Sequence, residues 1–191
     1  MTADYWERDP KRLAFVLARY KFVARMLEAF GRVLEVGCAD GFGSRIVRQH
    51  VGELTAVDID AASIEEAKRG GSKVWPVTFW EHDILAKALP GFDAVYALDV
   101  LEHIEPEMSN QFLCRLRQCA SVAVIGMPSL ESQAYASELS RKGHVNCMRG
   151  PDLKRALQRQ WPNVFMFSMS DEVVHTGFQP MAHYRMALAV A

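Results

Sequence analysis

The sequence predicts an α/β protein built on a doubly wound sheet, and three observations carry this prediction. Short apolar runs that suit buried strands alternate with stretches of helical periodicity between Arg32 and Pro128. A glycine-rich turn, GCADGFG, follows the first apolar run, where sheets of this class place their ligands. Two more strand-like runs close the chain without a helical stretch between them, so we expect them to pair antiparallel.

The expected elements follow one another in a regular order. Apolar residues recur at helical spacing from Leu13 to Phe30, and Gly31 is placed to end this helix. Asp60 is expected to cap a helix over Ala61 to Arg69. The expected strands cover 33–37, 54–59, 74–84, 92–100, 121–128, 163–170 and 181–190, and further helices cover 42–50, 106–119 and a segment that begins at Pro151.

Two segments depart from this alternation. Pro76, in the third strand candidate, cannot donate to a neighbouring strand, so we expect that strand at an edge of the sheet. Residues 129–149 are polar and longer than an ordinary connection, with Tyr135, His144 and Asn146 spread through them. We interpret this stretch as an insertion or lid that shapes a substrate site.

The composition limits the classes of partner. The chain has 22 basic and 23 acidic residues and a net charge of −1, so it lacks the basic excess typical of nucleic-acid binding. It has no apolar run long enough for a membrane span, and the N-terminus has no apolar signal region. The four cysteines show no CxxC spacing and are interpreted as reduced thiols. These features predict a cytoplasmic protein without nucleic-acid or membrane partners.

The glycine-rich turn predicts a binding site at the carboxyl edge of the sheet. Gly37 and Gly41 permit positive φ and a close approach of a ligand to the backbone. Asp58 ends the second strand, where a carboxylate can accept hydrogen bonds from both hydroxyls of a ribose. Asp83 ends the third strand, within reach of a purine edge. Glu35 would repel a pyrophosphate, so the expected ligand carries adenosine but no phosphate near the turn.

The blocks VLEVGCADG, AVDID, EHDI and FDAVYALDVLEHI resemble, in this order and spacing, the signature blocks of the class I S-adenosylmethionine-dependent methyltransferases. The resemblance covers residues 32–128 most closely. It implies a Rossmann-like, seven-stranded sheet with an antiparallel last strand, helices on both faces, and S-adenosylmethionine as the cofactor. It divides a single domain, 1–191, into an N-terminal helix or lid (1–30), a cofactor-binding half (32–128), a substrate insertion (129–149) and a C-terminal helix with strands (150–191).

The resemblance also implies roles for residues around this cofactor. Glu35 would lie near its methionine end, and Asp58 would hold the ribose hydroxyls. Ala39 stands where the family usually has a third glycine, from which we expect a slightly tighter fit without loss of binding. The full implied set is Glu35, Gly37, Ala39, Gly41, Asp58, Ile59, Asp83, Ile84, Leu98 and Asp99.

The chemistry of the acceptor points to a histidine. An oxygen acceptor often needs its proton removed, and histidine is the usual base near neutral pH. The candidates are His144 in the insertion, His103 after the fourth strand and His175 between the last strands. We expect no metal, because no Asp-Asn pair follows Asp99.

The back half of the chain suggests which acceptor this is. The segments PSLESQAYAS, GHVNC and DEVVHTGFQPMAHY resemble, less closely, small methyltransferases of bacterial cell-surface sugar pathways. This resemblance implies O-methylation of a small molecule, namely a sugar, a nucleotide sugar or a related hydroxylated compound. Amino-group methylation of nucleic acid is not expected, because LDVLEH stands where an Asn/Asp-Pro-Pro-aromatic block would be.

Other functions stay open at this point. A non-catalytic cofactor-binding or partner protein can share the fold, since fold does not fix function. An NAD-dependent oxidoreductase is disfavoured, because the chain has neither the G-x-G-x-x-G turn nor a Tyr-x-x-x-Lys pair. Tyr5 and Trp6 could close over the cofactor or pack the first helix onto the core. The number of chains in the assembly is not indicated.

Overall fold

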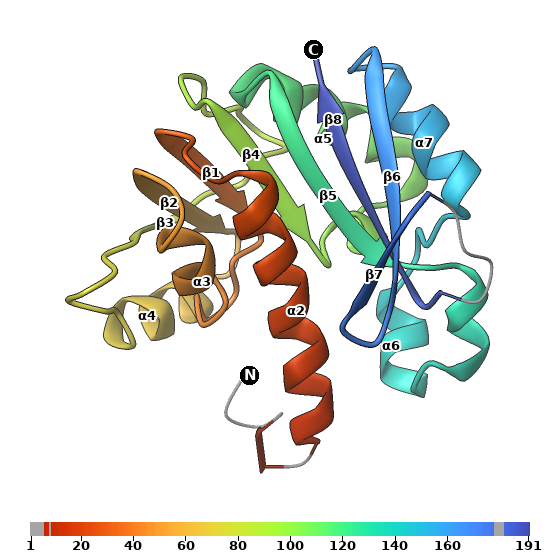
Figure 1. Ribbon diagram of the computed structural model, residues 1–191, viewed down its shortest axis with the longest axis horizontal. Coiled ribbons are helices and arrows are strands. Elements are labelled where there is room, and N and C mark those ends of the chain that lie inside the picture. Colours follow the sequence, from red (N-terminus) through yellow and green to blue (C-terminus); the bar gives the residue numbers. More distant parts are fainter. Residues whose placement is uncertain (1–5, 8, 178–181) are drawn as a thin grey trace.

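The computed structural model of the chain describes residues 6–7, 9–177 and 182–191. Its centre is a mixed sheet whose eight strands lie in the order β3-β2-β1-β4-β5-β8-β6-β7 (Figure 1). Strands β1 to β5 pair in parallel, whereas β8 is antiparallel to both β5 and β6. The strands are β1 (Arg32–Val36), β2 (Glu53–Asp58), β3 (Thr78–Glu81), β4 (Ala94–Leu98), β5 (Val122–Pro128), β6 (Asn163–Ser170), β7 (Val173–Thr176) and β8 (Tyr184–Val190).

The doubly wound α/β class and the antiparallel closing strand are confirmed, but the expected count of seven strands is wrong by one. The additional strand is β7, which pairs antiparallel with β6 and places Val173 opposite Ser170. The sequence predicts a loop here, because only about eleven residues without helical character separate the last two expected strands. Val173 and Val174 are both exposed. The strand is therefore held by its hydrogen bonds to β6 and not by burial of an apolar face.

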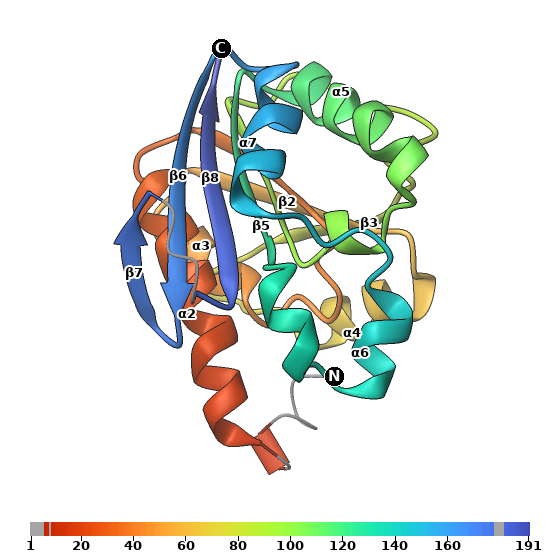
Figure 2. The same cartoon turned by 90° about the vertical axis from the view of Figure 1, so that its right-hand side faces the viewer.

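Helices cover both faces of the sheet. Figure 2 shows α2 and α3 on one side of it and α5 and α7 on the other. The insertion between β5 and α7 is itself partly helical, because it contains η3 and α6. The helices are α2 (Pro10–Met26), α3 (Ser44–Arg48), α4 (Ala61–Arg69), α5 (Ser109–Cys119), α6 (Glu138–Gly143) and α7 (Gly150–Gln158), and the 3-10 turns are η1 (Leu101–His103), η2 (Pro106–Met108) and η3 (Glu131–Tyr135).

Strand β4 shows how the sheet is held between these layers. All five of its residues are buried. Tyr96 packs into the core under α2, with Leu27. Val95 and Ala97 pack into the core under α5 and α7, with Leu116. A parallel strand that is buried on both faces appears in sequence as a continuous apolar run, which is what AVYAL shows.

Two local signals in the sequence are confirmed. The side chain of Asp60 accepts hydrogen bonds from the backbone N–H groups of Ala62 and Ser63 and so caps α4, whose bounds are those expected. Strand β3, which follows Pro76, lies at one edge of the sheet. The cap sets where α4 begins, and the edge position leaves β3 paired with β2.

The strand order reverses between β1 and β4, which is where sheets of this class form a ligand crevice. The views in Figures 1 and 2 agree that α2 and α6 both extend beyond this carboxyl edge, on opposite sides of the crevice. Tyr5 lies outside the described residues, and Trp6 is 68% exposed, so no packing role of Trp6 on the core is seen. Among the residues described, none of the helices has both the length and the apolar character that crossing a bilayer demands.

Candidate functional site

A cavity of about 1090 Å³ opens at the carboxyl edge of the parallel strands. This volume is slightly above the roughly 300–1,000 Å³ that is typical of ligand pockets. The wall combines the loops after β1 to β4 with residues of α2 and α6. Glu35, Gly41 and His175 are not part of this wall, and His175 lies on β7. The sequence-predicted residues that line the cavity are Gly37, Ala39, Asp58, Ile59, Asp83, Ile84, Leu98, Asp99, His103 and His144.

The glycine-rich turn is shaped by three residues with positive φ. Gly37 has φ 81° and Gly41 has φ 66°. A Cβ on Gly37 would overlap the side chain of Val100, so this position excludes any larger residue. Ala39 has φ 46°, in the left-handed region that glycine tolerates best. The alanine therefore carries backbone strain at a position where the turn favours glycine.

Asp58 is held with its carboxylate at the cavity wall. Its Oδ2 accepts a hydrogen bond from the backbone N–H of Ala39 at 2.8 Å, and its Oδ1 accepts one from Asp60 at 2.9 Å. Each carboxylate oxygen keeps a further lone pair for a ligand. Ile59 beside it is 69% exposed, and Asp83 accepts from the N–H of Leu85 at 2.8 Å. The cavity wall thus offers two carboxylates held by backbone N–H groups and the exposed apolar side chain of Ile59.

Glu35 is the buried acid beneath the turn. It is 1% exposed, and burial raises its pKa to about 7. The hydroxyls of Ser44, Tyr96 and Tyr20 partly offset this rise, although none of them completes a hydrogen bond to Oε2 of Glu35. Glu35 thus keeps an unpaired acceptor oxygen beside Tyr20, a residue that does line the cavity.

Sequence analysis missed the contribution of α2 to the site. Arg19 forms an ion pair with Asp99, and Tyr20 lies against Gly43 so closely that a Cβ there would overlap its ring. Arg19 and Tyr20 both line the cavity, together with Arg12 and Leu13. The signal in the sequence was Gly43, the third glycine of the turn, because a glycine outside a regular position can mark a close approach of another element to the backbone.

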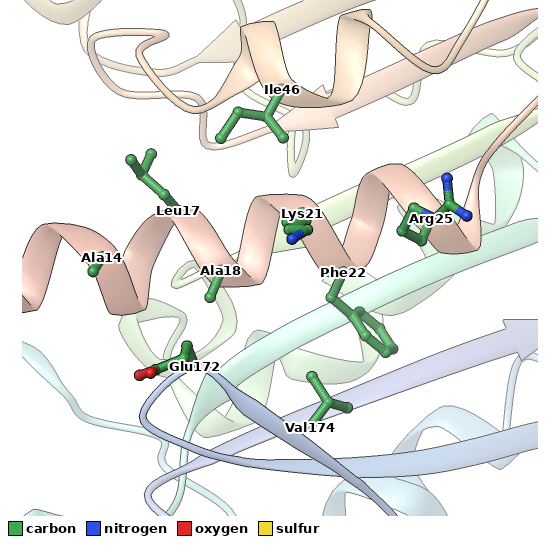
Figure 3. A pocket seen from close by; sticks show the side chains of 9 residues that line it. All are labelled: Ala14, Leu17, Ala18, Lys21, Phe22, Arg25, Ile46, Glu172 and Val174. Atoms are coloured by element: carbon green, nitrogen blue, oxygen red, sulfur yellow. The ribbon is translucent and has the colours of Figure 1, made fainter.

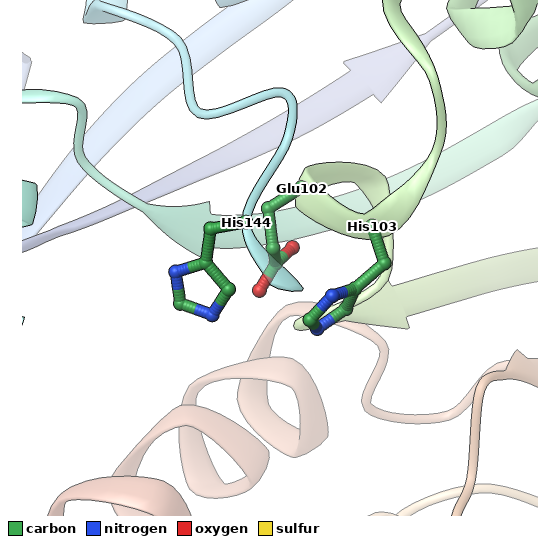
Figure 4. Close-up of side chains that lie close together, drawn as sticks. All are labelled: Glu102, His103 and His144. Carbon is green, nitrogen blue, oxygen red and sulfur yellow. The ribbon is translucent and has the colours of Figure 1, made fainter. Parts of the chain in front are cut away.

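A second cluster brings Glu102 and His103 of η1 together with His144 at the end of α6 (Figure 4). One ligand atom from each residue lies within 4.8 Å of the other two, and the two imidazole rings have centroids 5.2 Å apart. Glu102 is fully buried, and neither of its carboxylate oxygens has a hydrogen-bond partner among the described residues.

The electrostatics of this cluster follow from its burial. Burial is the largest cause that raises the pKa of Glu102, and the charge of Asp99 raises it further. Burial and the neighbouring His103 lower the pKa of His144. Sequence analysis identified both histidines but missed Glu102, because a charged residue next to an exposed histidine gives no sign of being buried. Glu102 is the residue that makes the cluster a candidate for holding a cation.

The other face of α2 borders a smaller hollow of about 550 Å³ (Figure 3). It lies between this helix and the turn that joins β6 to β7, where Glu172 and Val174 project toward Ala18 and Phe22. Leu17 lines both hollows, so α2 is the partition between them. Most of this wall is apolar, and none of the sequence-predicted site residues is part of it.

Comparison with known proteins agrees with this geometry. A family model described as a methyltransferase domain matches residues 33–121. An uncharacterized methyltransferase of Mycobacterium tuberculosis is 39% identical over 75 residues, which are 38% of this chain and 38% of that protein. The ubiquinone biosynthesis O-methyltransferase of Xanthomonas axonopodis pv. citri is 29% identical over 126 residues. The match spans 62% of this chain and about half, 51%, of that relative's length.

Solved structures show the same fold. The methyltransferase domain of a bacterial Hen1 protein superposes with a TM-score of 0.74 at 15% identity, covering 92% of this chain and 98% of that one. The N-methyltransferase NodS of Bradyrhizobium japonicum, in complex with S-adenosyl-L-homocysteine, superposes with a TM-score of 0.67 at 18% identity, covering 91% and 84%. These matches agree with the resemblance of the sequence blocks, since residues 33–121 match a methyltransferase domain and the solved methyltransferase structures share the fold of this chain.

Proposed function

We propose that this protein is a methyltransferase that uses S-adenosylmethionine to methylate a hydroxyl group of a small molecule. The observation that carries the proposal is the position of Asp58, fixed at the end of β2 on the wall of a cavity floored by a positive-φ glycine turn. Bound there, S-adenosylmethionine would supply a methyl group on a good leaving group, so the protein has mainly to align two molecules.

The residues present fit this cofactor. The lone pairs left on Asp58 suit the ribose hydroxyls, and the exposed face of Ile59 suits an adenine ring. Asp83 with Ile84 would meet the amino edge of that ring, and Leu98 would flank the methionine part. The unpaired Oε2 of Glu35 suits the cationic end. NodS has been crystallised with S-adenosyl-L-homocysteine at the corresponding fold, which supports the same cofactor here.

The acceptor is proposed from the opposite wall. His103 and His144 line the cavity together with Ser137 and Ser140 of the insertion, a set that suits a hydroxyl-rich molecule such as a sugar. Activation of the acceptor oxygen falls to the histidines, either as bases or as holders of a cation. His175 lies apart on β7 and would act only if its strand belonged to another wall of the site. The O-methyltransferase among the relatives supports an oxygen acceptor.

The domain division is proposed in the same terms. Residues 32–128 form the cofactor-binding half, 129–149 the substrate insertion, 1–30 a wall or lid, and 150–191 the end of the sheet.

The four cysteines are free thiols, which fits a reducing compartment, and we place the protein in the cytoplasm. The likeness to Hen1 concerns the fold alone, and a net charge of −1 gives no support to an RNA acceptor.

Two binding titrations test the proposal. In calorimetry we expect S-adenosylmethionine to bind with a micromolar Kd and NAD not to bind. Formation of S-adenosylhomocysteine is then measured against sugars, nucleotide sugars, phenols and a short RNA. Binding of the cofactor without turnover of any acceptor would favour the non-catalytic alternative, and binding of NAD alone would overturn the cofactor assignment.

A further inference from the structure

We propose that Glu102, His103 and His144 form a binding site for one divalent transition-metal cation. The ligand atoms of the three residues lie within 4.8 Å of one another, the spacing at which a single ion can contact all of them. In Figure 4 the carboxylate of Glu102 lies between the two imidazole rings. Two imidazoles and a carboxylate are a common set of protein ligands for such ions.

The hydrogen bonds of the two histidines fix the nitrogen that each offers. Nδ1 of His103 lies 2.8 Å from the carbonyl oxygen of Gly143, which can only accept, so this nitrogen carries the proton. Nδ1 of His144 lies 2.9 Å from Oε1 of Gln133. In both rings Nε2 is left with its lone pair. Metal-bound histidines usually donate their second N–H to a carbonyl or carboxylate in this way.

The orientation of the Gln133 amide is itself determined. Its Nε2 donates to the backbone oxygen of Ser129 at 3.3 Å and to the hydroxyl of Ser132 at 3.4 Å. Oε1 must therefore face His144, which makes it an acceptor for Nδ1. The tautomer of His144 follows from three residues of the insertion that no reaction step requires. This is the kind of outer support that a built metal site has.

Glu102 supplies an independent observation that points to a cation. A fully buried carboxylate is normally satisfied by hydrogen bonds or by a positive charge, and both oxygens of Glu102 lack a hydrogen-bond partner. The nearest guanidinium, that of Arg19, is already paired with Asp99. A bound ion would satisfy both the carboxylate and the two imidazole nitrogens.

The ligand set indicates the class of ion. Imidazole suits Zn²⁺, Fe²⁺, Ni²⁺ and Cu²⁺, whereas Mg²⁺, Ca²⁺ and Mn²⁺ prefer oxygen ligands. All three side chains line the large cavity, so the remaining coordination positions of the ion face the space for the acceptor. An ion with open positions acts as a Lewis acid on a bound oxygen. The role of the ion as a Lewis acid rests on the proposed methyl transfer, whereas the binding of the ion to the three side chains does not.

The test uses the full chain without a polyhistidine tag, freed of metal by a chelator that is then removed. Co²⁺ is titrated in while its visible absorption is followed, and Zn²⁺ is then added to displace it. We expect one Co²⁺ per chain, displacement by Zn²⁺, and no competition by Mg²⁺. His103→Ala and Glu102→Gln should weaken binding by more than the roughly 10–100-fold expected for the outer-partner variant Gln133→Leu. His50→Ala, which removes a histidine paired with Glu28 elsewhere, is the control and should bind normally.

Two results would overturn the site. One is a wild-type protein that binds no Co²⁺, and the other is binding that survives in both His103→Ala and Glu102→Gln. His103 is exposed, so its variant should fold, and circular dichroism verifies this for each protein. S-adenosylmethionine binding is measured separately on the metal-free protein. Loss of cofactor binding with intact Co²⁺ binding would contradict the methyltransferase proposal and leave the metal site standing.

Discussion

Nη1 of Arg19, on α2, lies 2.9 and 2.7 Å from the two carboxylate oxygens of Asp99, the residue that follows β4. Asp99 has φ 55°, a conformation that is uncommon outside glycine and clusters at functional sites. The guanidinium also lies 3.8 Å from the centre of the Tyr184 ring. One side chain thus connects the N-terminal helix, the floor of the cavity and β8.

Arg19→Ala should lower the free energy of unfolding by about 2 kcal/mol, the size of one charge-assisted hydrogen bond to a partly buried group. Thermal and urea denaturation measure it. Arg25→Ala is the matched control on the same helix. Arg25 forms an exposed ion pair with Glu28, so this substitution should cost less than about 0.5 kcal/mol. Equal losses in the two variants would mean that the contact with Asp99 adds nothing beyond helix propensity.

Asp58→Ala should weaken S-adenosylmethionine binding by roughly 3 kcal/mol, about a hundredfold in Kd, because two charge-assisted bonds to the ribose are lost and water replaces them in part. Calorimetry measures the change. Asp60→Asn alters a neighbouring carboxylate but keeps an oxygen to cap α4, so its affinity should stay near wild type. An Asp58→Ala protein that still binds normally would remove the ribose assignment.

Glu35 should make the stability of the cofactor-free protein depend on pH. Its pKa is about 7 when folded against 4.5 as the ordinary value, so between these pH values the folded state holds more protons than the unfolded state. Stability should therefore fall as pH rises from about 4.5 to 7, by about 3 kcal/mol in all. Urea denaturation across this range measures the slope, and Glu35→Gln should reduce it. An unchanged slope in the variant would assign the effect to another group.

Gly37→Ala should disturb the turn more than the same change at another positive-φ glycine. Its new Cβ would overlap Val100, and the left-handed backbone adds strain of about 1–2 kcal/mol. Gly177 has φ 74° but no atom within 4 Å of a built Cβ, so Gly177→Ala carries the strain alone. We expect weaker cofactor binding for Gly37→Ala only. Denaturation of both variants separates the strain from the overlap.

Asn146→Ala should loosen the attachment of the insertion. Its side chain donates to Ser109 Oγ at 2.7 Å and to the carbonyl of Leu101 at 3.2 Å, while its backbone N–H donates to Glu102. We expect a loss of stability of about 1–3 kcal/mol from the buried groups left unpaired, and lower turnover at unchanged cofactor affinity. The exposed Asn163, whose amide only reaches a carbonyl at 3.5 Å, provides the control Asn163→Ala.

The sequence was sufficient for those parts of the molecule that local chemistry determines. Asp60 as a helix cap, the edge position after Pro76 and the apolar run of β4 are set within a few residues. Strand β7 was missed because it is determined by its pairing with β6, and because its two exposed valines do not show the alternation of apolar and polar residues that marks a strand. The alternation of strands and helices, together with the signature blocks, therefore predicted the fold to within one strand.

The sequence predicted the part of the cavity wall that lies at the strand ends. Asp58 is the last residue of β2 and Asp83 lies two residues after β3, so the fold class alone places them at one edge. Glu102 and Arg19 were missed for a different reason. The role of Glu102 depends on its burial, and that of Arg19 depends on Asp99, a partner 80 residues away in the chain. No local spacing in the sequence encodes either of these. Tertiary contacts of this kind need the structure.

The partition formed by α2 has a consequence for how substrate preference could evolve in this fold. The methyltransferase family model begins at residue 33 and ends at residue 121. Tyr20 and Leu17 precede that range and His144 follows it, yet all three line the cavity. In the function proposed above, the shared half holds the cofactor, and the two segments outside it face the acceptor. Relatives that match only the shared half can therefore differ in the molecule they methylate, and exchanging α2 and the insertion between them is the direct way to transfer that choice.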